Sequence, residues 1–308
     1  MAANFPKYAW MNGKTIPWDD AKVHVQTPAF RYGAMVFEGL RGYWNPDEKE
    51  LYLFRMEDHF QRLQESVKVM RMELDYSVEQ FMRPFVELVK ANDFHEDIHA
   101  RYMVYVDGVG PIGSLGPVGI SIVCLNKGRG YDLEKGISCS VSSWIRIKDN
   151  VIPPRVKCAA NYQNGRLAVM QAKHDGYDTA LLFTEEGKLT ETPTTCVFMV
   201  RRGQVTTPRI TDGILESVTR SSLITLFERD LGFPVVERGI DRTELYVAEE
   251  VFMCGSGAEV VPIVNIDGYR VGTGSRGPLT QKIQEAYFKT ARGYKKEYNH
   301  WLTPVYKK

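Results

Sequence analysis

The chain of 308 residues is long enough for two domains with a sizeable hydrophobic core. Its 39 basic and 38 acidic side chains give a formal net charge of +1 without a block of one sign, so binding to nucleic acid or to a membrane surface has no support. No apolar stretch approaches the ~20 residues that span a bilayer, and residues 1–7 lack the apolar core of a signal peptide. The five scattered cysteines predict free thiols in a reducing, cytoplasmic compartment and no metal site.

Turn and cap signals predict an irregular alternation of strands and helices. Asn12-Gly13, between two short strand-like runs, predicts a two-residue hairpin. Ser77 and Gln80 form a capping box that predicts a helix to about Ala91, kinked at Pro84. The remaining predicted elements are an amphipathic helix at 59–72, strands at 101–106, 119–125, 179–183 and 196–200, and helices at 163–174, 218–230, 242–249 and 279–291.

A polar, glycine-rich segment at 126–136 is predicted to be an interdomain linker. It would join a small N-terminal α/β domain, residues 1–125, to a large C-terminal domain, residues 137–308. The pattern of elements by itself predicts only a two-domain α/β or α+β protein.

Lys157 is the first candidate for catalysis, because its neighbours in sequence are small or apolar and none of them neutralises it. Desolvation disfavours the ammonium form, and a neutral amine attacks a carbonyl to form a Schiff base. A lysine in an apolar run is more often a surface group whose charged end reaches water. The assignment therefore depends on motifs elsewhere in the chain.

Three downstream features have the chemistry of a site for a phosphorylated ligand. Glu191 ends a strand-like run before a Thr/Pro-rich loop. Ser217 is a predicted N-cap, so the amides of Val218 and Thr219 would lie at the positive end of a helix dipole, where phosphate binds. The run 255–258, Gly-Ser-Gly-Ala, lets backbone amides approach an anion closely. Each feature alone is most often an ordinary cap or turn.

Further motifs accompany these features in a fixed order. They are Asn161-Tyr162, Gly176-Tyr177, Gly213-Ile214-Leu215, Thr219-Arg220, 249–252, 255–259 and Gly277-Pro278, preceded by Tyr32-Gly33, 36–41 and 59–63. In order and spacing the set resembles the branched-chain amino acid aminotransferases, which belong to fold type IV of the pyridoxal-phosphate enzymes. The resemblance runs from about Trp10 to about Tyr287, nearly the whole chain.

The resemblance implies a role for each matching residue toward pyridoxal 5'-phosphate. Lys157 would form the Schiff base and later move the proton, and Glu191 would keep the pyridine nitrogen protonated so that the ring accepts electrons. Tyr162 would contact the phenolic oxygen of the ring. The phosphate would be held by Arg62, Val218, Thr219 and Ser256.

For the amino acid and 2-oxo acid substrates, the resemblance implies a pocket lined from the N-terminal half and a turn whose amides meet the α-carboxylate. The pocket residues would be Tyr32, Phe37, Arg41 and Arg101, and the turn residues Gly257 and Ala258. The implied fold is that of a type IV aminotransferase, with a smaller α/β domain, a larger pseudo-barrel domain and the cofactor at their interface. The loop 108–117 would reach toward a neighbouring subunit, in a homodimer or a higher homo-oligomer.

The sequence departs from the family pattern at three places. Ser256 stands where threonine is common and keeps the hydroxyl group. The loop 192–196, Thr-Pro-Thr-Thr-Cys, replaces one that usually contains glycine and ends in asparagine, which affects how the ring is positioned. The run 99–102, His-Ala-Arg-Tyr, replaces a pattern with a tyrosine two residues before an Arg-Pro pair, which affects substrate range.

Two short motifs point to other chemistry and are rejected. The run 95–99 matches the zinc-protease pattern H-E-x-x-H, but it is predicted to lie between a helix and a strand and not on one helical face. The run 108–113 matches G-x-G-x-x-G, but the loop 114–117 follows it where a dinucleotide site needs a helix.

Three classes of function remain. The favoured one is amino transfer from branched-chain L-amino acids (Leu, Ile, Val) to 2-oxoglutarate by a ping-pong mechanism. The second is another activity of the same fold, such as a D-amino acid or (R)-amine transaminase or aminodeoxychorismate lyase. The third is a cofactor carrier without catalysis, against which the joint presence of Lys157, Glu191 and both phosphate loops argues.

Overall fold

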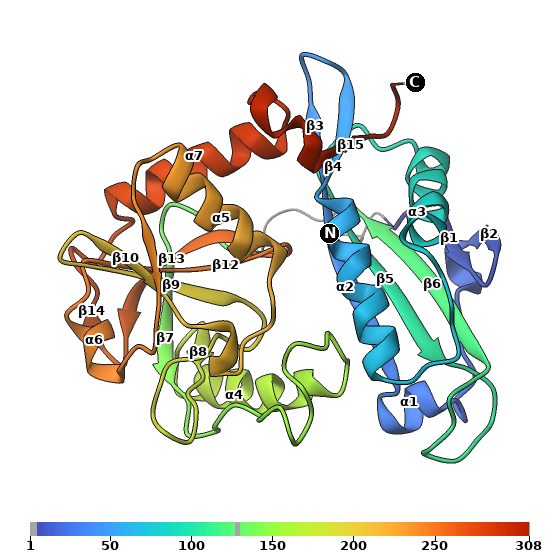
Figure 1. Cartoon of the computed structure of the whole chain (residues 1–308), viewed down its shortest axis with the longest axis horizontal. Coiled ribbons are helices and arrows are strands. Elements are labelled where there is room, and N and C mark those ends of the chain that lie inside the picture. Colours follow the sequence, from blue (N-terminus) through green and yellow to red (C-terminus); the bar gives the residue numbers. More distant parts are fainter. Residues whose placement is uncertain (1–4, 127–129, 308) are drawn as a thin grey trace. The chain divides into compact units, whose positions relative to one another are not determined.

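The computed structural model describes residues 5–126 and 130–307, and these form two compact units (Figure 1). The first unit contains the described residues of Met1–Gly128 together with Val156–Ala160 and Lys289–Lys308. The second contains those of Arg129–Arg155 and Asn161–Phe288. A short segment around Lys157 therefore belongs to the first unit although the second surrounds it in sequence.

The first unit is built on one antiparallel sheet of seven strands in the order β15-β4-β3-β5-β6-β1-β2. The strands are β1 (Tyr8–Met11), β2 (Lys14–Pro17), β3 (Met35–Asn45), β4 (Glu50–Phe54), β5 (Ile98–Val106), β6 (Val118–Leu125) and β15 (Leu302–Pro304). Its helices are α1 (Pro28–Tyr32), α2 (Met56–Val69) and α3 (Val78–Asn92), with short 3-10 segments at Trp18–Asp20 and Lys296–Trp301.

Helix α2 packs on β3, and α3 packs on β1 and β6. The contact is aromatic: Phe60 of α2 lies 4.9 Å from Tyr102 of β5 and 6.0 Å from Phe81 of α3, measured between ring centroids. All three side chains are completely buried. Burial of one such side chain stabilises the fold by ~1.5–3 kcal/mol, which fixes the helix to the sheet.

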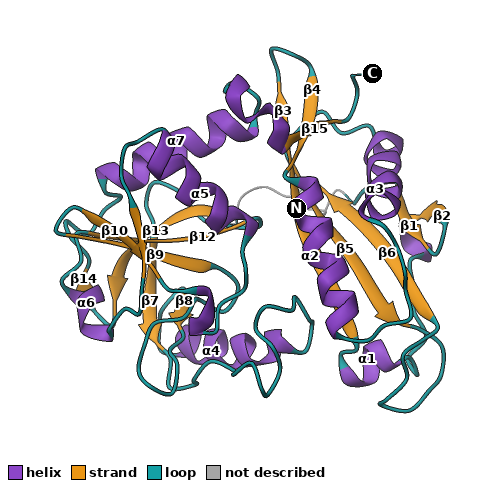
Figure 2. Ribbon diagram, in the orientation of Figure 1, coloured by secondary structure: helices purple, strands orange, loops and turns teal. Residues whose placement is uncertain are grey.

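The second unit contains a mixed sheet in the order β11-β10-β9-β12-β13-β7-β8, with β14 paired to β13 (Figure 2). The strands are β7 (Ile137–Val141), β8 (Thr179–Leu181), β9 (Cys196–Arg201), β10 (Gln204–Thr207), β11 (Val235–Glu237), β12 (Glu250–Gly255), β13 (Glu259–Ile266) and β14 (Tyr269–Arg270). The remaining helices are α4 (Asn161–His174), α5 (Val218–Arg229), α6 (Arg242–Tyr246) and α7 (Pro278–Ala291), with a 3-10 turn at Ile210–Asp212.

Several local predictions are confirmed. Asn12 (φ 47°) and Gly13 (φ 92°) form the two-residue turn between β1 and β2. The capping box at Ser77 begins α3, and Ser217 caps α5. The other predicted helices and strands are present, and their ends are shifted by at most three residues. The largest shifts are at both ends of α2, at the start of β5 and at the end of α6.

The C-terminal residues extend the first sheet. Glu50 accepts hydrogen bonds from the backbone amides of Val305, Tyr306 and Lys307, at 2.9, 2.8 and 2.6 Å. The described residues 289–307 group with the first unit, whereas the predicted C-terminal domain spans 137–308. The predicted domain boundaries themselves stay a prediction, and residues 127–129 of the predicted linker lie outside the described residues.

The two rejected motifs have the irregular backbone that was expected. Helix α3 ends at Asn92 and β5 begins at Ile98, so His95 and His99 do not share a helical face. No helix follows the run 108–113, which leads through a loop into β6. Within residues 5–126 and 130–307, no cluster of three or more His, Cys, Asp or Glu side chains suits a metal ion, and none of the helices has the length and apolar character needed to cross a membrane.

Candidate active site

The backbone around Lys157 is fixed by pairing with β3. Val36 and Cys158 form an antiparallel bridge, and the amide of Phe37 donates to the carbonyl of Lys157 at 3.0 Å. Cys158 is buried against the sheet, which explains why a small side chain stands beside the lysine. The Lys157 side chain is half-buried, with Nζ 5.0 Å from the ring centroid of Phe37. The amine is therefore held against an aromatic face at the edge of the core.

Directly after Phe37 in β3 lies a cluster of buried charged and polar side chains. Glu38 is completely buried and accepts two hydrogen bonds from Arg62 of α2, Oε1 from Nε and Oε2 from Nη2, both at 2.7 Å. His59 of the same helix lies with Nδ1 2.7 Å from Oε2 of Glu38. The amide of Lys157 donates to Oγ of Ser66, further along the same helical stripe, at 3.4 Å.

The charge state of this cluster follows from its pairing. Burial alone would raise the pKa of Glu38, but the Arg62 guanidinium and the hydrogen bond with His59 outweigh it and hold that pKa at about 2. Burial lowers the pKa of His59 below its usual 6.5, despite the Glu38 carboxylate. At neutral pH we therefore assign a carboxylate to Glu38 and a neutral imidazole to His59, which donates from Nδ1 because a carboxylate only accepts.

These shifts predict a stability that falls with acidification. The unfolded chain takes up a proton at His59 below pH 6.5 and at Glu38 below pH 4.5, whereas the folded chain resists both. We expect the free energy of unfolding to decline from pH 6.5 and more steeply below 4.5, with Glu38 contributing about 3 kcal/mol when its protonation is complete. Urea unfolding from pH 7 to 3 measures this. In Glu38→Gln the loss below pH 4.5 should be smaller than in the wild type but should not vanish, because other carboxylates with a lowered pKa, such as Glu244, remain. Parallel curves would contradict the assignment.

The predicted substrate residues of the first unit lie mostly on β3 and β5. In the register of these strands Arg41 lies opposite His99 and Gly39 opposite Arg101. Nε2 of His99 lies 3.3 Å from the point that a β-carbon on residue 39 would occupy. A side chain larger than that of glycine would therefore be crowded at position 39. Arg101 lies with its guanidinium carbon 5.7 Å from the ring centroid of Phe37, which places Phe37 near two cations.

Tyr32 lies apart from this group, at the end of α1. Its hydroxyl accepts a hydrogen bond from Arg31 at 2.6 Å, and Arg31 also donates to the carbonyl of Gly110 at 3.4 Å. The tyrosine is therefore linked to the loop 107–117 of its own unit.

In the second unit, Glu191 is buried and held at both carboxylate oxygens. Oε1 pairs with Nη2 of Arg146 at 2.5 Å, and Oε2 accepts from the amide of Leu215 at 3.2 Å. Nε of Arg146 donates to the carbonyl of Gly213 at 3.0 Å, so the same arginine fixes the turn before α5. A nearby guanidinium favours the ionised carboxylate, the state that the proposed contact with a pyridine nitrogen needs.

The loop after Glu191 satisfies its own hydrogen bonds, although it departs from the family pattern. Oγ1 of Thr192 accepts from the amides of Thr194 and Thr195, at 3.3 and 3.0 Å. Tyr162, in the first turn of α4, is half-buried. A β-carbon on residue 165 would meet the carbonyl oxygen of Pro193 at 2.8 Å, so glycine at 165 lets α4 lie against this loop.

The two predicted phosphate loops have the backbone that their sequences indicate. Ser217 accepts from the amide of Arg220 at 3.2 Å, and Val218 and Thr219 begin α5 as buried residues. Between β12 and β13, Ser256, Gly257 and Ala258 form the turn, and Glu259 follows with φ 64°. The guanidinium of Arg220 donates hydrogen bonds to Thr207, Pro208 and Glu237. These contacts give Arg220 a structural role.

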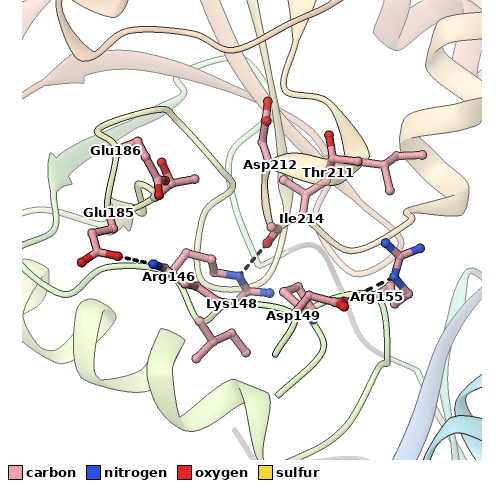
Figure 3. Close-up of a pocket in the computed structure, with 14 residues that line it drawn as sticks. Arg146, Lys148, Asp149, Arg155, Glu185, Glu186, Thr211, Asp212 and Ile214 are labelled. Carbon is pink, nitrogen blue, oxygen red and sulfur yellow. Dashed lines mark hydrogen bonds and ion pairs between the residues drawn. The ribbon is translucent and has the colours of Figure 1, made fainter. Parts of the chain in front are cut away.

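A pocket of about 210 Å³ lies in the same unit, beneath the turn that Arg146 fixes (Figure 3). Two pairs of its charged side chains form ion pairs within the lining, Lys148 with Glu185, and Arg155 with Asp149 at 3.5 Å. None of the predicted cofactor or substrate residues is among its lining residues.

The chain matches a known protein family over most of its length. A family model described as amino-transferase class IV matches residues 35–266. The chain belongs to the class IV aminotransferases. It is 39% identical over 303 residues to a probable branched-chain-amino-acid aminotransferase of Aquifex aeolicus, covering 98% of this chain and 97% of that protein.

Solved structures agree with this membership. The PLP form of the branched-chain amino acid aminotransferase from Thermobaculum terrenum has a TM-score of 0.93 at 40% identity, covering 98% of this chain and 99% of that one. The T.th. branched-chain amino acid aminotransferase, complexed with N-(5'-phosphopyridoxyl)-L-glutamate, has a TM-score of 0.91 at 34% identity, covering 97% and 99%. The predicted family and the predicted type IV fold are confirmed.

The candidate site contains three buried side chains that no single sequence motif points to. Glu38 and His59 lie within longer motifs, and Arg146 lies in none of them. A carboxylate inside the apolar run 36–40 was the available signal for Glu38, because a fully buried charge needs a partner. Arg146 carries no comparable signal, since Glu191 lies 45 positions further along.

The donor groups present fit pyridoxal 5'-phosphate, each within its own unit. The first unit supplies an amine at Lys157 and a buried guanidinium at Arg62. The second supplies a paired carboxylate at Glu191, the N-terminus of α5 and the turn at 256–258. The individual roles of these residues stay predictions.

Proposed function

We propose that this protein transfers the amino group of branched-chain L-amino acids (Leu, Ile, Val) to 2-oxoglutarate, using pyridoxal 5'-phosphate in a ping-pong mechanism. The observation that carries the proposal is the position of Lys157, whose amine lies against Phe37 on a segment hydrogen-bonded to β3. Family membership over nearly the whole chain supports the reaction class. The relative named for branched-chain amino acids supports the substrate class.

Pyridoxal 5'-phosphate, when bound, supplies a ring that withdraws electrons from the substrate α-carbon. Lys157 would bind it covalently and would then carry the proton of the α-carbon. Glu191, which is paired with Arg146, would hold the proton on the ring nitrogen. Tyr162 would contact the phenolic oxygen. The phosphate would be bound by Arg62, Val218, Thr219 and Ser256.

The substrate contacts combine an apolar face with cationic groups. Phe37 offers its ring to an aliphatic side chain, and Arg41 and Arg101, on the neighbouring strands β3 and β5, offer charge to a carboxylate. Tyr32, which lies apart from these residues at the end of α1, stays a predicted pocket residue on the family resemblance alone. The amides of Gly257 and Ala258 meet the α-carboxylate. The glutamate adduct in the T.th. enzyme supports an acceptor with two carboxylates.

A panel of amino donors tests this function against its sister activities. Purified protein with 2-oxoglutarate should produce glutamate from L-Leu, L-Ile and L-Val, and much less from D-alanine or an (R)-amine. L-Lysine serves as a donor that an apolar pocket rejects. Preference for D-amino acids or (R)-amines would replace the proposed substrate class, and absence of any transamination by holoenzyme would reject the reaction.

We also propose that the active form is a homodimer or a higher homo-oligomer. Phe30, Val109 and Ile112 are 69%, 77% and 75% exposed, which is unusual for large apolar side chains in one neighbourhood, and Arg31 ties α1 to the loop at Gly110. The loop 108–117 would close the active site of the neighbouring subunit. Light scattering should give at least twice the chain mass, and a monomer active at assay concentration would refute the proposal.

We propose a cytoplasmic location because the cysteine thiols of this protein are in the reduced form. The cysteines at 124, 139, 158, 196 and 254 are all buried and form no disulfide. Proteins with several unpaired thiols are typical of a reducing compartment.

A further inference from the structure

Arg62 makes an unusual contact for a residue proposed to bind phosphate. Glu38 takes one edge of its guanidinium through two parallel hydrogen bonds of 2.7 Å, Nε to Oε1 and Nη2 to Oε2. Such a two-point contact fixes the plane of the guanidinium as well as its position. Arg62 is 8% exposed and Glu38 is completely buried, so the two side chains form a buried ion pair of the unit and not a solvent-exposed one.

His59 fixes the carboxylate in turn. Its Nδ1 lies 2.7 Å from Oε2 of Glu38, on the oxygen that also accepts from Nη2 of Arg62. His59 is 2% exposed, so its ring is packed on nearly every side. Both oxygens of Glu38 are thus committed, and rotation of the carboxylate would break at least one of three short contacts.

The same face of α2 also meets the proposed catalytic lysine. His59, Arg62 and Ser66 follow one another at three and four residues, which places them on one helical stripe. Oγ of Ser66 accepts a hydrogen bond from the backbone amide of Lys157 at 3.4 Å. The stripe therefore sets the guanidinium of Arg62 at a fixed place relative to the backbone of Lys157.

We propose that Glu38 is a positioning residue that holds Arg62 in the orientation in which it receives the cofactor phosphate, and that His59 locks Glu38 for this purpose. The inference rests on the proposed function, because Arg62 is taken there as a phosphate ligand. If Arg62 supplied only positive charge, a carboxylate 2.7 Å away would oppose phosphate binding. A fully buried carboxylate at that place therefore serves geometry, since a preorganised ligand loses less freedom on binding.

The test uses apoprotein titrated with pyridoxal 5'-phosphate and, in parallel, with pyridoxal, which lacks the phosphate. In Glu38→Gln we expect the dissociation constant for the phosphorylated form to rise roughly tenfold to a hundredfold, as for loss of a charge-assisted contact. The constant for pyridoxal should stay as in the wild type. Tighter binding of the phosphorylated form, or an equal change for both forms, would overturn the inference.

A matched control is Glu50→Gln. Glu50 is also a completely buried carboxylate of the first unit, but it binds the C-terminal backbone amides. This variant should lose stability while keeping the ratio of the two dissociation constants. If Glu38→Gln does not fold, Glu38→Asp keeps the charge but shortens the reach by one methylene. It should show the same selective loss, and a wild-type ratio would overturn the inference.

A double-mutant cycle separates this inference from the proposed function. In an Arg62→Ala background, Glu38→Gln should change the binding of the phosphorylated form little further, because its effect acts through Arg62. A full additional loss would show that Glu38 acts by another route. Failure of the wild-type protein to bind pyridoxal 5'-phosphate more tightly than pyridoxal would reject the proposed function itself.

Discussion

Lys157→Ala should abolish transamination and leave the protein folded. The side chain is half-buried on a segment whose backbone is held by β3, and its removal takes no hydrogen bond from that pairing. Because this group both binds the cofactor covalently and moves the proton, its loss should lower turnover by ~10⁴ or more. Some cofactor should still bind noncovalently through Arg62 and the two amide loops.

Borohydride reduction identifies the lysine directly. Treatment of the yellow holoenzyme should fix the cofactor on Lys157, as peptide mapping by mass spectrometry will show. Lys188→Ala is a suitable control, because its amine is exposed and pairs with Asp241 at 2.5 Å. Recovery of the reduced adduct on another lysine, or an unchanged rate in Lys157→Ala, would move the catalytic assignment elsewhere.

The features that the sequence predicted well are those with local causes. A two-residue turn needs positive φ at Asn12 and Gly13, and a helix needs a cap such as Ser77 or Ser217, so the signal lies within four positions of the structure it predicts. The position of the C-terminal residues depends instead on Glu50, more than 250 positions away. No sequence signal within residues 302–307 predicts that Glu50 is their partner.

The same distinction applies to the site. The family resemblance nominated the amine of Lys157, the carboxylate of Glu191 and the two amide loops as site residues, because they stand in recognisable motifs. The supporting contacts were not recognised, since a guanidinium such as Arg146 has no periodicity and finds Glu191 only through the fold. Glu38 was visible as a charge within an apolar strand, but its choice of His59 and Arg62 over other partners depends on how α2 lies on β3.

Glu191→Gln should separate catalysis from cofactor storage. Glutamine keeps the size of the side chain, and its amide oxygen can still accept from Arg146 or from the amide of Leu215, as the carboxylate does at 2.5 and 3.2 Å. The substitution removes the negative charge, so the ring nitrogen should lose its proton for much of the time. Groups that stabilise developing charge in this way are typically worth ~10²–10⁴ in rate.

The expected result is a large loss of turnover with nearly intact cofactor occupancy, because the phosphate contacts are elsewhere and Lys157 is unchanged. Absorbance of the bound cofactor and steady-state rates measure the two quantities on the same sample. Glu185→Gln is the matched control, since that carboxylate is exposed and pairs with Lys148 in the same unit. If Glu191→Gln runs at the wild-type rate, the buried pair with Arg146 is a structural ion pair, and the ring nitrogen must be protonated by a different group.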